Sequence, residues 1–324
     1  MKVLAQQGLA SIEESLSRYD LLPATRQRLI EIYNSSKQNT ESITALMHHY
    51  DITAPEDYQA GQFNPGDLSE YFDLVLRDWA WDTTHTPNKE NSSAFQRIFN
   101  ALKNIPPPKR ILVLGAGAGR LSWDIHTHFK PEYSVALDSN PLLLAVANSL
   151  IHEQQSLVFG EFKNFPQLNF PVSQTWTLSP PEDKENLRAT WFPLGANVWQ
   201  LPFSDESFDL IITPWFIDVN GGDVRDLIGV ISKKLVPSGY WINSGPLYSP
   251  VIYRYNSNIR RKKSRNLSTG QISLLIPSIS KIPTIYYHPL KHASDKSKSG
   301  HSARKKIANQ NLDRQIAKSF PTGW

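Results

Sequence analysis

The chain has 324 residues and no cysteine, and its net charge of +4 conceals two regions of opposite sign. Without cysteine, a disulfide framework, a thiolate nucleophile and a zinc–thiolate site are excluded. Residues 254–324 hold fifteen of the 34 basic residues and two of the 30 acidic residues, so this segment carries +13 and the remainder −9. Because the sequence shows no stretch of 18 apolar residues and no signal peptide, we expect a soluble, cytoplasmic protein without membrane contact.

Residues 1–104 show helical apolar spacing and are predicted to form an N-terminal helical cap. The predicted helical segments are residues 26–33, 43–50, 68–79 and 95–102. The neighbouring His48 and His49 would point to different faces of a helix, so we interpret them as surface residues and not as metal ligands. Arg77 follows Asp73 by four residues, a spacing that by itself predicts a solvent-exposed ion pair.

A strand, a glycine-rich turn and a helix are predicted over residues 110–129. Residues 111–114 are four branched apolar residues, and Gly115, Gly117 and Gly119 alternate directly after them. Such a turn lets the backbone approach a ligand, and free N–H groups at the helix start are expected to add a positive pole.

The spacing of these glycines distinguishes two ligand classes. A dinucleotide fingerprint requires a glycine at position 120, where this chain has Arg120. The triplet instead resembles the first motif of class I S-adenosylmethionine (SAM) methyltransferases, which disfavours a nicotinamide oxidoreductase. A tight strand–helix turn without a ligand is the alternative interpretation.

A second apolar segment, residues 133–138, ends in Asp138, about twenty residues after the glycines. An acid at this position can accept hydrogen bonds from both hydroxyl groups of a ribose. The alternative is a structural acid at a helix start, since Asn140 and Pro141 are favourable residues for a helix N-terminus.

The sequence after Asp138 completes the predicted sheet. Residues 190–197, 210–213 and 240–243 are predicted strands, residues 141–151 and 224–235 are predicted helices, and the polar residues 152–189 are interpreted as an insertion over the sheet edge. Alternating strands and helices predict an α/β, doubly wound, Rossmann-like domain over residues 105–253. Ligands of such sheets bind at the carboxyl ends of the strands. There we expect the glycine turn, Asp138, Asn197 and residues 214–218 and 244–248.

The order of four motifs resembles the N2227-like family, whose characterised members are carnosine N-methyltransferases. The motifs are Leu-Arg-Asp-Trp at 76–79, Val-Leu-Gly-Ala-Gly-Ala-Gly-Arg-Leu at 113–121, Trp-Phe-Ile-Asp at 215–218 and Trp-Ile-Asn-Ser-Gly-Pro-Leu at 241–247. The resemblance spans roughly residues 65–250, and the last two motifs are the more specific because most class I methyltransferases lack them. It implies a class I methyltransferase fold, SAM as cofactor, a small imidazole-containing acceptor related to carnosine, and no metal.

The resemblance also implies roles for individual residues. The implied cofactor-binding residues are Arg77, Gly115, Ala116, Gly117, Gly119, Asp138, Ser139, Asn197, Val198 and Pro214. Arg77, in the part of the cap at residues 65–80, would bind the methionine carboxylate, and Asp138 the ribose. Asp218 would be the catalytic residue and would hold the acceptor imidazole, with Tyr248 as a second substrate contact. Ser249 stands where the family has a substrate-contacting histidine, so another small imidazole or an amine acceptor is an alternative to carnosine.

Residues 254–324 do not match the family. The fold requires a helix and two antiparallel strands after the fifth strand, whereas this segment offers a short apolar run at 272–279 and a lysine-rich stretch at 296–306 that is predicted to be disordered. Two alternatives therefore accompany the methyltransferase hypothesis: a non-catalytic SAM-binding protein, and a nucleic-acid methyltransferase that binds phosphates through this basic segment. Nucleic acid is not favoured, because residues 213–216 lack the Asn/Asp-Pro-Pro-Tyr-like motif of base methyltransferases.

Overall fold

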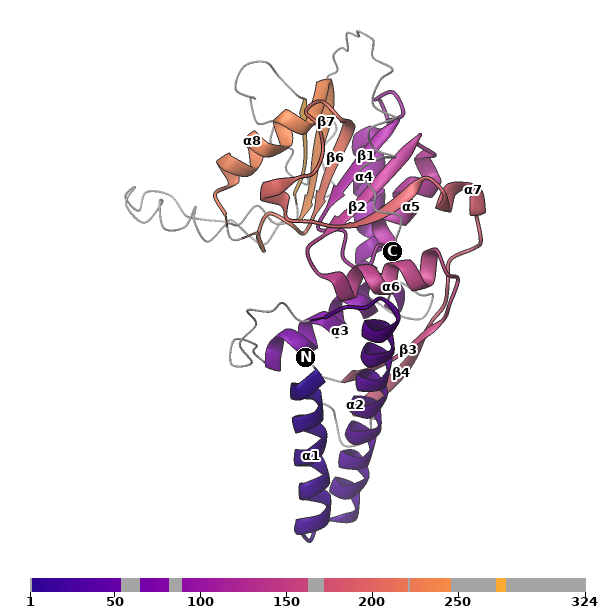
Figure 1. The fold of residues 1–324 in the computed structure, drawn as a ribbon, viewed down its shortest axis with the longest axis vertical. Coiled ribbons are helices and arrows are strands. Elements are labelled where there is room, and N and C mark those ends of the chain that lie inside the picture. Colours follow the sequence, from indigo (N-terminus) through magenta and orange to yellow (C-terminus); the bar gives the residue numbers. More distant parts are fainter. Residues whose placement is uncertain are drawn as a thin grey trace, which may run out of the picture.

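The computed structural model describes residues 2–53, 65–81, 89–162, 172–220, 222–245 and 272–277. A long helical hairpin extends from an α/β body (Figure 1). The hairpin consists of α1 (Lys2–Arg18) and α2 (Pro23–His49), and α3 (Pro65–Trp79) and α4 (Glu90–Leu102) lead from it to the sheet. The prediction of N-terminal helices is confirmed, and a single helix, α2, joins the predicted segments 26–33 and 43–50.

The main sheet has six strands in the order β5-β2-β1-β6-β7-β8. The strands are β1 (Arg110–Leu114), β2 (Tyr133–Asp138), β5 (Trp191–Gly195), β6 (Phe208–Pro214), β7 (Leu235–Gly245) and β8 (Ile272–Pro277). The first five are mutually parallel, and in their register Leu112 faces Val135 on one side and Ile211 on the other. This arrangement confirms the predicted doubly wound α/β fold.

Helices cover both faces of this sheet. The helices after β1, β2 and β6 are α5 (Arg120–Phe129), α6 (Pro141–Ile151) and α8 (Val224–Lys234). Ile111 and Val113 belong to a core with α3, α4, α5 and α6, whereas Leu112 and Leu114 pack on the other face with residues of α8. Each fully buried aliphatic side chain of this kind contributes about 1.5–3 kcal/mol.

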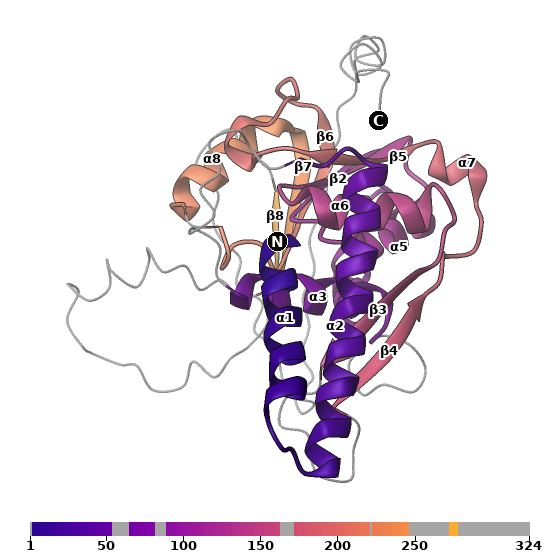
Figure 2. The same ribbon diagram turned by 60° about the horizontal axis from the view of Figure 1, so that its bottom comes forward.

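The sequence predicted that the polar segment before β5 covers the edge of the main sheet. The structure shows instead that this segment forms a separate two-stranded sheet. Strands β3 (Leu157–Phe162) and β4 (Ser173–Leu178) pair antiparallel and lie beside α2 (Figures 1 and 2). The amide of Asn39 on α2 donates to the Gly160 carbonyl at 2.9 Å and accepts from the Gly160 N–H at 2.6 Å. A helix side chain thus satisfies backbone groups at the edge of β3, which an isolated hairpin would leave to water.

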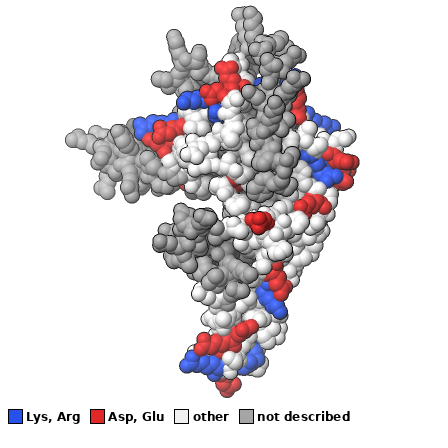
Figure 3. All heavy atoms as spheres, viewed as in Figure 1, with Lys and Arg blue, Asp and Glu red and all other residues white. Residues whose placement is uncertain are grey.

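The C-terminal segment contributes one strand to the described sheet. Part of the predicted apolar run forms β8, which pairs antiparallel with β7 from Tyr240–Pro277 to Gly245–Ile272. The lysine-rich stretch at 296–306 lies outside the described residues. On the face shown in Figure 3, basic and acidic side chains are interspersed over the described elements. No helix among the described residues is long and apolar enough to cross a bilayer.

A buried histidine connects α5 to the sheet and makes stability depend on pH. The His126 ring is 0% exposed; its Nδ1 lies 2.9 Å from the Ser134 hydroxyl and its Nε2 lies 2.9 Å from the Leu187 carbonyl. Because a carbonyl only accepts, Nε2 carries the proton and Nδ1 accepts from Ser134. Burial lowers the pKa of His126 to about 4.

We expect the free energy of unfolding to fall by about 2–3 kcal/mol between pH 7 and pH 4 because of this residue. The folded pKa lies below the unfolded value near 6.5, so the unfolded chain takes up the proton first as the pH falls. Urea unfolding at several pH values measures the slope, which should be shallower in His126→Gln and unchanged in the control His48→Gln on the exposed side of α2. An equal slope in all three proteins would contradict the assignment.

Candidate functional site

The carboxyl ends of the five parallel strands share one edge of the sheet, as the sequence predicted. The strand order reverses between β1 and β6. The helices that follow these two strands, α5 and α8, pack on opposite faces. In open α/β sheets the crevice that binds the ligand lies above two such strand ends. Two segments meet there: the turn 115–119 after β1 and the segment that begins at Trp215 after β6.

All five N–H groups of the turn 115–119 have acceptors within the protein. The Gly115 and Ala116 N–H groups donate to the Leu137 carbonyl, each at 2.9 Å, and Gly119 donates to Ala116 at 3.0 Å. The two N–H groups between them donate to carboxylates, as described below. The predicted free N–H groups belong to the start of α5, and the five N–H groups of the turn are not among them. A phosphate-binding turn needs such groups to face the ligand, so the turn is unsuited to a pyrophosphate.

The three glycines of the turn have different neighbours. A Cβ on Gly115 (φ +71°) would lie 2.6 Å from the Phe216 ring, and one on Gly117 (φ +60°) would lie 3.1 Å from the Asp78 carboxylate. A Cβ on Gly119 (φ +86°) would instead lie 2.8 Å from the Cβ of Ala147 in α6. Gly115 and Gly117 thus face groups of the crevice, whereas Gly119 faces the core. We assign Gly119 to packing of α5 and not to the predicted cofactor contact.

The end of α3 binds the turn through Asp78 and Trp79, and Arg77 beside them binds Asp78. The Arg77 guanidinium donates from Nε and Nη2 to Asp78 Oδ1 at 3.1 and 3.0 Å, and its carbon lies 4.8 Å from the centre of the Trp215 ring. Asp78 Oδ2 accepts the Ala118 N–H at 2.9 Å, and the Trp79 indole donates to the Ala118 carbonyl at 2.8 Å. The Arg77 side chain is 16% exposed. The spacing from Asp73 had predicted a solvent-exposed Arg77, and this predicted exposure was wrong.

Asp138 binds the opposite side of the turn. Its Oδ2 accepts the Gly117 N–H and its Oδ1 accepts the Asn140 N–H, both at 2.9 Å. Burial raises the pKa of Asp138, and the bonds from the Asn140 and Gly117 N–H groups oppose that rise. Asp138 therefore serves the helix start and the glycine turn together, so the two interpretations from sequence do not exclude each other. Ser139 beside it is exposed.

Asn197 and Val198 follow β5 at the same edge. The Asn197 side-chain oxygen accepts the Trp199 N–H at 3.0 Å and caps the short helix η1 (Val198–Gln200). One lone pair of that oxygen and the amide NH₂ remain for a ligand. The Val198 side chain is buried in the core beneath α8.

The segment after β6 carries the predicted catalytic residue. Pro214 is buried, and Trp215 (φ +45°) donates its N–H to the Ser244 carbonyl at 3.0 Å. A Cβ on Gly245 would lie 2.9 Å from the Trp215 nitrogen, so only glycine permits this contact between the two loops. Asp218 is half-buried, and its buried Oδ1 has no hydrogen-bond partner within the described part of the chain. Tyr248 lies outside the described residues.

Two residues of the site were missed from sequence. Asp78 was noted only as part of a motif, although its carboxylate joins Arg77 to the turn. Asn91, at the start of α4, is 1% exposed and donates to the Arg77 carbonyl at 3.1 Å. The consecutive Arg-Asp-Trp could have identified Asp78. Nothing local marks Asn91, because its contact depends on the packing of α3 against α4.

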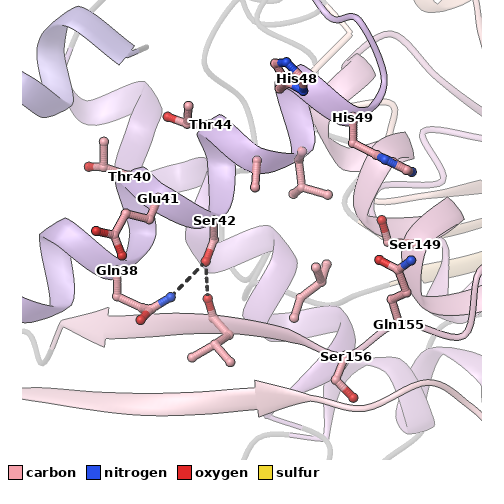
Figure 4. Close-up of a pocket in the computed structure, with 14 residues that line it drawn as sticks. Gln38, Thr40, Glu41, Ser42, Thr44, His48, His49, Ser149, Gln155 and Ser156 are labelled. Atoms are coloured by element: carbon pink, nitrogen blue, oxygen red, sulfur yellow. Dashed lines mark hydrogen bonds between the residues drawn. The ribbon is translucent and has the colours of Figure 1, made fainter.

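A second hollow lies away from the strand ends. It measures about 960 Å³ and is bordered by α2, β3 and the end of α6 (Figure 4). His48 and His49 line it, and His49 Nε2 lies 2.9 Å from Glu153 Oε1. Both histidines are exposed, as predicted. None of the cofactor or substrate residues predicted from sequence lines this hollow, and the described residues contain no group of three metal-binding side chains.

The profile of the family described as Carnosine N-methyltransferase matches residues 60–282. The chain is 25% identical over 262 residues to Carnosine N-methyltransferase of Dictyostelium discoideum, covering 76% of this chain and 53% of that protein. It is 27% identical over 210 residues to the Schizosaccharomyces pombe enzyme of the same name, covering 59% of this chain and 53% of that protein. The chain thus spans about half the length of these curated relatives.

Among solved structures, the chain is similar to a putative S-adenosyl-L-methionine-dependent methyltransferase from Methanococcus maripaludis. The identity is 15%, the match covers 63% of this chain and 73% of that one, and the TM-score is 0.38. The family match, by contrast, covers more than half of the chain and includes the turn 115–119, Arg77 and Asp218. This chain belongs to the carnosine N-methyltransferase family of SAM-dependent methyltransferases.

Proposed function

We propose that this chain transfers the methyl group of SAM to a ring nitrogen of a small imidazole-containing acceptor such as carnosine. The observation that carries this proposal is the charge pattern at the glycine turn. Arg77 is the cation, Asp78 and Asp138 are the anions, and both anions bind N–H groups of the turn. With these groups ionised, their sum is −1, which suits a ligand with a net positive charge and opposes a phosphate.

The charges of SAM are complementary to this pattern. At neutral pH it carries a carboxylate, an ammonium and a sulfonium, so its net charge is +1. Arg77 would bind the carboxylate through charge-assisted hydrogen bonds. Asp138 would accept from the ribose, because the N–H groups of Gly117, Asn140 and Ser139 use at most three of the four lone pairs of its carboxylate.

In the proposed reaction, the main task of the protein is to position the cofactor and the acceptor. When bound, SAM supplies an electrophilic methyl group on its sulfonium. The unprotonated nitrogen of a neutral imidazole has the lone pair needed for attack and requires no general base. Holding the two reactants in line at about 3–3.5 Å supplies much of the rate. Asp218 would accept the N–H of the other ring nitrogen, which selects the tautomer and stabilises the methylimidazolium as it forms.

Calorimetry with SAM, followed by mass spectrometry of carnosine and of histidine incubated with protein and SAM, tests the proposal. We expect binding of SAM and the gain of one methyl group by an imidazole compound, with methylation of the ring nitrogen confirmed by fragmentation. Binding of SAM without methylation of any imidazole compound would favour the non-catalytic alternative. The absence of SAM binding would reject the cofactor assignment for this chain.

A further inference from the structure

We propose that Asp78 is a positioning residue that fixes the Arg77 guanidinium over the glycine turn, so that one edge of the guanidinium remains for the cofactor carboxylate. This inference rests on the proposed function, in which Arg77 binds that carboxylate. It adds a residue that would act on the cofactor only through Arg77.

Protein donors bind both oxygens of the Asp78 carboxylate. Its Oδ1 accepts from Arg77 Nε and Nη2, and the Asn91 amide lies 3.4 Å from the same oxygen. Its Oδ2 accepts the Ala118 N–H at 2.9 Å. The residue is 2% exposed, so Asp78 has no surface with which to contact a ligand itself.

The contact with Asp78 divides the donors of the guanidinium. An arginine has five N–H donors, and the side edge presents Nε–H and one Nη2–H. Asp78 takes this side edge. The distal edge, formed by Nη1 and Nη2, keeps the geometry that binds a carboxylate through two parallel hydrogen bonds. The ring of Trp215 lies 4.8 Å from the guanidinium carbon and restricts the plane of the group.

The Asp78 carboxylate also fixes the orientation of the Arg77 guanidinium relative to the turn. Asp78 lies at the end of α3, forty residues before Ala118 in the sequence. The Trp79 indole donates to the carbonyl of the same Ala118, so α3 contacts the backbone of one turn residue through two side chains. The guanidinium is therefore placed relative to Gly117 and not merely relative to α3. Loss of Asp78 would free Arg77 to adopt other rotamers before the cofactor binds, which costs affinity.

Two ligands separate this role from a structural one. S-adenosylhomocysteine carries the amino-acid carboxylate, whereas 5′-methylthioadenosine has the same nucleoside and lacks the carboxylate. In Asp78→Asn we expect the affinity for S-adenosylhomocysteine to fall about tenfold, the loss of a hydrogen bond to a charged group. The affinity for 5′-methylthioadenosine should change less than about twofold. In turnover assays, KM for SAM should rise about tenfold while kcat at saturation stays within about twofold.

A double-mutant cycle tests whether Asp78 acts through Arg77. In the Arg77→Ala background, Asp78→Asn should cause no further loss of S-adenosylhomocysteine affinity, because the group it positions is absent. The matched control is Asp209→Asn: Asp209 accepts from the Arg110 guanidinium and N–H at the amino ends of β1 and β6, far from the crevice. That variant should lower stability and leave the ratio of the two ligand affinities unchanged.

Three results would overturn the inference: unchanged S-adenosylhomocysteine affinity in Asp78→Asn, an equal loss for both ligands, or additive losses in the cycle. If Asp78→Asn does not fold, Asp78→Glu replaces it, because the longer side chain keeps the charge but cannot hold Arg77 and Ala118 with the same geometry. Wild-type protein that binds neither ligand would instead reject the proposed function. Normal wild-type binding with any of the three results rejects only the role of Asp78.

Discussion

Replacing Asp218 with alanine is expected to lower kcat for imidazole methylation by about 10²–10⁴-fold, the range found for groups that orient or stabilise a reacting imidazole. The dissociation constant of SAM should change less than about twofold, because the cofactor contacts that we propose come from Arg77, Asp138 and the turn 115–119. Calorimetry with SAM and single-turnover kinetics with carnosine measure the two effects separately.

The stability of the same variant provides a second, independent outcome. Asp218 Oδ1 is buried and has no hydrogen-bond partner among the residues that the structure describes. A buried acceptor without a donor costs about 1–3 kcal/mol, so a position that serves folding alone is not expected to keep one. We therefore expect Asp218→Ala to leave the midpoint of thermal unfolding unchanged or to raise it. An inactive variant that is also strongly destabilised would instead indicate a structural role.

Asp218→Asn refines the chemical assignment. The amide keeps the shape of the side chain but removes the charge that would stabilise a methylimidazolium, so we expect a loss of rate similar in order to that of the alanine variant. Asp226→Asn, on the exposed first turn of α8, is the matched control and should retain full activity. Full activity of Asp218→Asn would show that the reaction does not require the negative charge of Asp218.

The largest expected effect on stability belongs to Gly119→Ala. The left-handed backbone at φ +86° costs an L-residue about 1–2 kcal/mol, and a methyl group 2.8 Å from the Ala147 Cβ adds an overpacking cost of about 1–3 kcal/mol. We expect the free energy of unfolding, measured with urea, to fall by about 2–5 kcal/mol. The ring of Trp191, whose Cη2 would lie 3.2 Å from the new methyl group, leaves little room for adjustment.

The matched control for this substitution is Gly229→Ala. Gly229 lies within α8, and a Cβ there would meet no atom within 4 Å. Since alanine is favoured over glycine in a helix by about 0.5–1 kcal/mol, this variant should be more stable than the wild type. If Gly119→Ala instead lost SAM affinity and kept its stability, Gly119 would belong to the cofactor site and our assignment of it to packing would be wrong.

The choice between cofactor classes shows how sequence and structure contribute differently. The position of Arg120 disfavoured a dinucleotide by spacing alone. The structure adds a physical reason, since Gly117 and Ala118 donate their N–H groups to Asp138 and Asp78. The two carboxylates thus already accept from the N–H groups that a pyrophosphate would require as donors. This could not be read from sequence, because the two acids lie on either side of the turn at separations of 21 and 40 residues.

Some features of this protein were determined by local sequence. Strand periodicity and the glycine triplet predicted β1, β2, β6 and their shared edge, because parallel strands that alternate with helices must end on the same side. The motifs could identify the family because each of them is a short, contiguous stretch of sequence. Local sequence is therefore sufficient to select Arg77, Asp138 and Asp218 as candidates for the site.

Other features were decided only by the tertiary structure. The β3–β4 hairpin depends on Asn39 in α2, which pairs with Gly160 across 121 residues. Whether a glycine serves the ligand or the core depends on what packs against it, which separates Gly117 from Gly119. The partner of Asp78 is likewise set by the placement of α3 on the turn. Periodicity and spacing describe neighbours along one element, whereas these contacts arise when distant elements pack, and no short stretch of sequence encodes their geometry.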